Sequence, residues 1–62
     1  MQAKITVKMD NAAFENRTRA ELARILRALA ESLDYGETLN VETKLPLHDS
    51  NGNNVGYLTI TA

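Results

Sequence analysis

The chain contains no cysteine and no tryptophan, and it has only one histidine and one proline in 62 residues. Without cysteine there is neither a disulfide nor a thiolate metal site. The absence of disulfides in so short a chain favours a cytoplasmic protein, since small secreted domains usually depend on such crosslinks.

Long apolar runs are also missing. No run approaches the roughly 20 residues of a membrane-spanning helix, and the opening sequence MQAKITVKMD has no apolar segment of signal-peptide length. We therefore expect no membrane association and no secretory leader. A length of 62 residues predicts a single domain, 1–62, with one core.

Charge of one sign is not in excess, because 7 basic residues stand against 8 acidic ones and give a net charge of −1. This balance argues against a general nucleic-acid binder, which needs a net basic footprint. A core this small barely offsets the entropy of ordering, about 1.5 kcal/mol per residue. We therefore expect self-association, most simply as a homodimer.

The stretch from Thr18 to Gly36 carries the longest clear pattern. Its branched aliphatic residues recur at i, i+3, i+4, i+7 and i+11, and they are Leu22, Ile25, Leu26, Leu29 and Leu33. This spacing predicts one amphipathic helix over about 19–34, packed on a sheet. Thr18 and Glu21 predict a capping box at its start, and Gly36 predicts a left-handed stop at its end.

Three other stretches alternate with period two and predict strands: Lys4–Met9, Thr38–His48 and Val55–Ala62. Pro46 cannot donate to a ladder, so the second strand is expected at an edge. The segment Asp49–Asn54 contains Asn-Gly, a strong signal for a hairpin turn.

The predicted fold class is therefore α+β, in the order β-α-β-β, with one amphipathic helix packed on a three-stranded mixed sheet and a C-terminal hairpin. A right-handed crossover would make the first two strands parallel, with the last strand between them. Phe14 is expected to sit under the helix, and Gly56 to mark a bulge or a close backbone approach. The open face of the sheet would carry Lys4, Thr6, Lys8, Tyr57, Thr59 and Thr61.

Motifs with chemical meaning are weak. Asp49, Asn51 and Asn53 have the spacing of a calcium loop, but Asn54 replaces its glycine and Ile60 its bidentate acid. The sole histidine, His48, lacks the context of a catalytic triad. We therefore predict no catalytic residue, no metal site and no cofactor, and the protein is not expected to be an enzyme.

Four arginines, Arg17, Arg19, Arg24 and Arg27, give the helix a basic side. Pair spacing such as Glu21 to Arg24 is typical of a solvated helix surface. The alternatives are an anchor for an acidic protein or for a phosphate backbone. The residues considered for partner binding are Arg17, Arg24, Arg27, Lys4, Lys8 and Tyr57.

Three segments, ITVKMDNAAFEN, ELARILRALAESL and LHDSNGNNVGYLTI, occur in this order over nearly the whole chain. Together they resemble short proteins encoded by bacteriophages and prophages, with the pattern D-N-A-A-F, then E-L-A-R-I-L-R, then D-x-N-G-N-x-V-G. The segment 40–46 fits this pattern least well. The resemblance implies a phage-related origin and action in the cytoplasm of a bacterial host, but no activity and no functional residues.

The hypothesis from the sequence is a small non-enzymatic protein-interaction module that binds a bacterial host protein or a phage protein. The alternative is a nucleic-acid-binding accessory protein that uses the helix arginines together with Lys4, Lys8 and Lys44. The two differ in salt dependence, because phosphate binding weakens steeply as salt increases.

Overall fold

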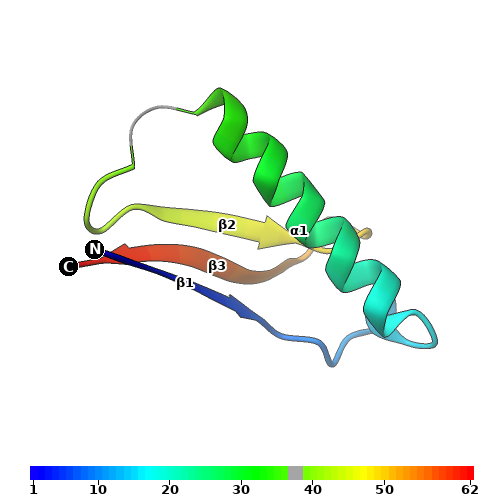
Figure 1. Ribbon diagram of the computed structural model, residues 1–62. Coiled ribbons are helices and arrows are strands. Elements are labelled where there is room, and N and C mark those ends of the chain that lie inside the picture. The colour runs from blue at the N-terminus through cyan, green and yellow to red at the C-terminus, as the bar shows by residue number, and fades with distance from the viewer. Residues whose placement is uncertain (37–38) are drawn as a thin grey trace.

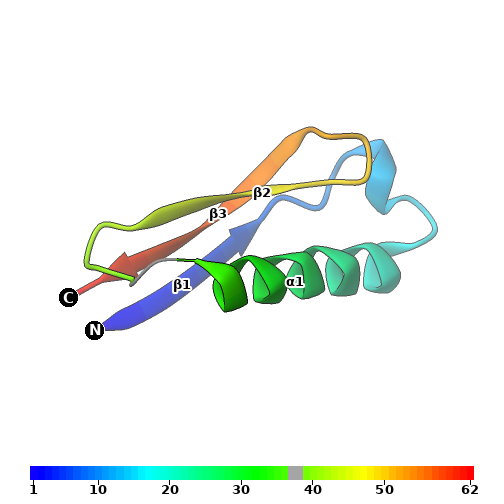
Figure 2. The same ribbon diagram turned by 90° about the horizontal axis from the view of Figure 1, so that it is seen from above.

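A computed structural model describes residues 1–36 and 39–62 of the chain. One helix lies against one face of a three-stranded sheet, which confirms the α+β class and the β-α-β-β order (Figure 1). The elements in chain order are β1 (Gln2–Val7), the short 3-10 helix η1 (Ala12–Phe14), α1 (Thr18–Tyr35), β2 (Lys44–His48) and β3 (Asn54–Thr61). Both chain ends lie at one end of the sheet, opposite the β2–β3 turn (Figure 2).

The last strand lies in the centre of the sheet, in the order β1-β3-β2, as predicted. β3 pairs antiparallel with both neighbours, so that Leu58 lies opposite Ile5 on one side and Leu45 on the other. The predicted mixed sheet is wrong, because β3 separates β1 from β2 and these two parallel strands never pair.

β2 is shorter than the predicted strand Thr38–His48. It begins only at Lys44, and Thr38 lies outside the described residues. A turn precedes it, in which Glu42 has φ 77° and the N–H of Thr43 donates to the carbonyl of Asn40 at 3.0 Å. The alternating sequence before Lys44 does not extend the strand, because this turn interrupts the extended backbone, although the N–H of Glu42 donates to the Ile60 carbonyl of β3 at 2.8 Å.

Gly56 is a position of close backbone approach, as predicted. A Cβ atom added there would overlap the carbonyl of Thr6 on β1. Next to it the β2–β3 register shifts, since Leu47 lies opposite Gly56 while His48 lies opposite Asn54. The residue skipped by this bulge, Val55, is buried and joins the core.

The core is built mainly under the first half of α1. Phe14 is only 2% exposed, which confirms its expected place under the helix. The buried residues are Ala13, Phe14, Ile25, Leu29, Leu47, Val55, Leu58 and Ile60. They come from η1, α1, β2 and β3, whereas β1 contributes only the partly buried Val7.

The predicted leucine stripe of α1 is only partly buried. Ile25 and Leu29 face the core, but Leu26 and Leu33 are each 40% exposed. The helix lies closest to η1 and β2, and its C-terminal end rises away from the sheet (Figure 1). In β1 the side chain of Ile5 is 47% exposed. The strand that was predicted to be half-buried at Lys4–Met9 is therefore largely exposed to solvent.

The helix spans the predicted residues to within one position at each end, but neither predicted cap forms. Arg17 is the N-cap residue without a side-chain hydrogen bond, and the Thr18 hydroxyl instead donates to the Phe14 carbonyl at 3.0 Å. Gly36 is extended, with φ −85° and ψ 173°, and not left-handed. Glu21 cannot complete a capping box because its carboxylate is bound elsewhere.

Within residues 1–36 and 39–62, no helix is long and apolar enough to cross a membrane.

Candidate functional site

The β2–β3 turn is organised around a buried acid. Asp49 is 4% exposed, and its Oδ1 accepts hydrogen bonds from the backbone N–H groups of Asn51 and Asn53, both at 2.9 Å. Its Oδ2 accepts from the side-chain amide of Asn11 at 2.8 Å. Gly52, with φ 84°, completes the turn predicted from Asn-Gly. The carboxylate that heads the calcium-like pattern thus accepts hydrogen bonds from its own turn and from Asn11.

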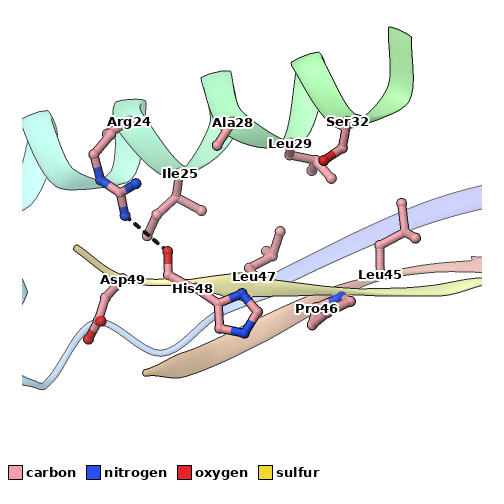
Figure 3. A pocket seen from close by; sticks show the side chains of 10 residues that line it. All are labelled: Arg24, Ile25, Ala28, Leu29, Ser32, Leu45, Pro46, Leu47, His48 and Asp49. Atoms are coloured by element: carbon pink, nitrogen blue, oxygen red, sulfur yellow. Dashed lines mark hydrogen bonds between the residues drawn. The ribbon is translucent and has the colours of Figure 1, made fainter. Parts of the chain in front are cut away.

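A second buried acid joins the helix to this turn. Glu21 is 5% exposed; Arg24 Nε donates to its Oε1 at 2.8 Å, and the Ser50 backbone N–H donates to its Oε2 at 2.8 Å. Arg24 also donates to the backbone carbonyl of His48 at 2.9 Å (Figure 3). We call Glu21, Arg24 and Asp49 the acid clamp. Glu21 and Arg24 tie α1 to the end of β2 and its turn, and Asp49 ties this turn to Asn11.

Both acids of the clamp are held in their charged form. The hydrogen bond from Arg24 is the main reason why the pKa of Glu21 lies below its ordinary value. Burial alone would raise the pKa of Asp49, but hydrogen bonds from Asn53, Asn51 and Asn11 outweigh it and lower the pKa. Every buried side-chain nitrogen or oxygen of the described residues has a hydrogen-bond partner. An acid that donates protons near neutral pH needs a raised pKa, so this geometry fits a structural tie.

A hollow of about 320 Å³ lies between α1 and β2 (Figure 3). Ala28 and Leu29 form one wall and Leu45 and Leu47 the other, while the ring of His48 points away from the helix. Among residues 1–36 and 39–62 there is no group of three side chains that could hold a metal ion.

The face of the sheet opposite α1 carries all three lysines of the chain. Lys4 and Lys44 lie on it directly opposite Thr59, one on each side of β3, and Lys8 follows the same alternation beyond β1. Tyr57 lies at the centre, 38% exposed, with Lys44 Nζ 4.1 Å from its ring centroid. We call these three lysines and Tyr57 the lysine face.

The lysine face has a shallow depression of about 220 Å³ beside Tyr57, lined also by Thr6, Lys8 and Asn54. None of the strand residues that share this face is acidic; the others on it are Gln2, Thr6, Pro46, His48, Thr59 and Thr61. In a chain with net charge −1, the strands of this face therefore contribute only basic charges.

The sequence-predicted partner residues fall into three groups. Lys4, Lys8 and Tyr57 come together on the lysine face. Arg17 and Arg27 are exposed on the helix, away from that face. Arg24 is engaged in the acid clamp, and its predicted pairing with Glu21 is confirmed.

The sequence predicts Lys44 as a contact residue only in the nucleic-acid alternative. Its spacing of two residues from Pro46 nevertheless puts these two side chains on the same face of the strand. The clamp had a weaker signal, because the contact between Glu21 and Ser50 joins residues 29 positions apart.

No protein-family model, no curated protein and no solved structure matches this chain.

Proposed function

We propose that the chain is a non-enzymatic protein-interaction module whose lysine face binds an acidic segment of a protein partner. The observation that carries the proposal is the segregation of charge. All three lysines project from the face of the sheet that the helix leaves free, and no acidic strand residue shares it.

The geometry of the face suits a protein partner. A sheet supplies a rigid surface, and the lysines lie on both sides of an aromatic ring that is partly exposed. Tyrosine is enriched at protein interfaces because it gives large contact area with few rotatable bonds. Lysines add electrostatic attraction, which favours rapid association with an acidic partner.

The resemblance to short phage proteins supports the further proposal that this action occurs in the cytoplasm of a bacterial host, on a host protein or a phage protein. Nucleic-acid binding through the helix arginines has less support, since Arg24 donates to Glu21 and to the carbonyl of His48. Of the four helix arginines, Arg17, Arg19 and Arg27 are exposed, and Arg24 is engaged in the acid clamp.

The test compares charge reversal on the two basic surfaces. We expect a fluorescent acidic peptide, such as a 12-residue Glu-rich chain, to bind the wild type at low salt. Lys4→Glu combined with Lys44→Glu should weaken binding at least about tenfold, while the matched pair Arg17→Glu and Arg27→Glu should change it little. Circular dichroism would verify that both variants fold.

A single-stranded oligonucleotide serves as the competing probe in the same anisotropy assay. Tighter binding to the oligonucleotide, lost in the arginine pair and retained in the lysine pair, would overturn the proposal in favour of nucleic-acid binding. Equal binding of the acidic peptide by the wild type and the lysine pair would also contradict it.

A further inference from the structure

The two outer strands of the sheet present different free edges. The N–H of Lys8 donates to the Val55 carbonyl at 2.7 Å, which sets the phase of the β1–β3 ladder. The backbone N–H and C=O groups of the even-numbered residues of β1 therefore point to β3, and those of Ala3, Ile5 and Val7 point to the free edge. β1 contains no proline, so all three outward N–H groups are available as donors.

The β1 edge is also apolar on the helix side. Ile5 is 47% exposed there because α1 lies toward β2. Arg24 and Ala28 line the hollow beside β2. Because successive helix residues are about 100° apart, the side chains of Leu22 and Leu26 project from the flank of α1 opposite Arg24 and Ala28. We call Ile5, Leu22 and Leu26 the open strip.

The molecule has more surface than its mass requires. A compact monomer of 6.9 kDa exposes about 4,000 Å², whereas this chain exposes 4715 Å². This excess of about 700 Å² is surface that a compact monomer of the same mass would bury. The chain is also elongated, with extents of 36 × 21 × 17 Å.

We infer that β1 pairs antiparallel with β1 of a second copy, so that two sheets join into one of six strands. A second copy is the occupant that the sequence of β1 fits best. When Ile5 lies opposite the partner's Ile5, the outward groups of Ala3 and Val7 pair as well. In this register Lys4 faces the partner's Thr6, and no two lysines lie directly opposite.

The neighbouring registers are worse. A shift that centres the pair on Lys4 would place two lysines side by side, which is destabilising. Centring on Thr6 would set Lys4 opposite the partner's Lys8. The Ile5 register instead buries apolar residues together on the helix side and extends the open strip across a two-fold axis. Both lysine faces then lie on the same side of the joined sheet. The pairing therefore doubles the area of the lysine face, and it does not depend on what the lysine face binds.

Light scattering on the full chain tests the pairing directly. We expect the wild type to have twice the chain mass of 6.9 kDa at about 100 µM. Ile5→Lys and Ile5→Glu should each give monomers, because like charges would meet across the axis. A one-to-one mixture of these two variants should restore the dimer at low salt. A wild-type monomer up to about 1 mM, or an Ile5→Lys dimer, would overturn the inference.

Crosslinking keeps the test independent of variants that lose stability. Because the wild type has no cysteine, Lys4→Cys and Thr6→Cys each introduce a single thiol. The proposed register brings residue 4 near the partner's residue 6, within the Cα separation of a disulfide. Mixing the two variants should therefore give the crosslinked pair, whereas neither should crosslink well alone. Crosslinking of Lys4→Cys alone, in preference to the mixture, would contradict this register.

Discussion

The two outer strands end the hydrogen-bonded ladder in different ways. In β2 the outward positions are Lys44 and Pro46, since the N–H of Ile60 donates to the Thr43 carbonyl at 3.0 Å and fixes the phase. Pro46 has no N–H to offer, and Arg24 already donates to the carbonyl of His48. β1 (Gln2–Val7) has no proline, and Lys4 is its residue of the kind that discourages edge pairing. The edge of β1 is therefore the less protected of the two, which is consistent with the pairing proposed above.

The same asymmetry runs through the packing. The closed side of the molecule, formed by η1, α1 as far as Leu29 and β2, holds five of the eight buried core residues and the acid clamp. The open side, formed by β1 and the flank of α1 near it, has exposed apolar residues. Burial is thus concentrated in one half of this small molecule, and the proposed pairing would use the other half.

The largest loss of stability is expected from a substitution at Gly56, where β1 joins β3. Gly56→Ala places a methyl group against the Thr6 carbonyl, so β1 cannot stay paired with β3. We expect a loss of more than about 4 kcal/mol in the free energy of unfolding, and hence a chain that is mostly unfolded by circular dichroism. Asn51→Ala is a matched control in the exposed turn and should remain folded. A folded Gly56→Ala variant of unchanged stability would show that the β1–β3 contact is not so close.

Smaller losses of stability are expected from substitutions of two adjacent helix residues, and these losses should differ. Ile25 is 1% exposed on the closed side, and Leu26 is 40% exposed on the open side. Ile25→Ala should cost about 3–4 kcal/mol, because it leaves a cavity in the core. Leu26→Ala should cost less than about 1 kcal/mol in dilute solution, while weakening the dimer. Urea denaturation at low protein concentration measures both, and equal losses would remove the distinction between the two sides.

The acid clamp makes the closed side sensitive to pH. The pKa values of Glu21 and Asp49 lie below their ordinary values of 4.5 and 3.8 in the folded chain. Their stabilising contribution is therefore complete above these ordinary values and is lost as pH falls through the lower folded pKa values. We expect thermal stability to be nearly constant from about pH 7 to pH 5 and to decline below about pH 4.5.

Glu21→Gln isolates one part of this pH dependence. The variant should melt at a lower temperature than the wild type at pH 7, and the difference should narrow toward pH 3 as the wild-type carboxylate becomes protonated. Glu31→Gln, on the exposed helix surface, is the matched control. A difference from the wild type that is the same at pH 7 and pH 3 would show that the charge of Glu21 does not stabilise the clamp.

Local sequence patterns are sufficient to predict those features of the fold that depend on residues close together in the chain. The periodicity predicts the helix, and the alternation around Tyr57 predicts the lysine face. Period alone cannot fix how far a helix rolls on a sheet, so Leu26 was expected in the core. The capping box of Thr18 and Glu21 also failed for a long-range reason, because Ser50 and Arg24 bind the carboxylate that the cap requires.

The smallest effect on stability tests the guarded edge itself. Pro46→Ala restores an outward N–H on β2, and Pro46 is exposed, so the free energy of unfolding should change by less than about 0.5 kcal/mol. The consequence should appear in association instead, because β2 could then pair as β1 does. Light scattering should detect species larger than the dimer in Pro46→Ala, and a dimer paired through β2 in Pro46→Ala combined with Ile5→Lys. If the double variant remained monomeric, the carbonyl of His48, held by Arg24, would be the more important guard of this edge.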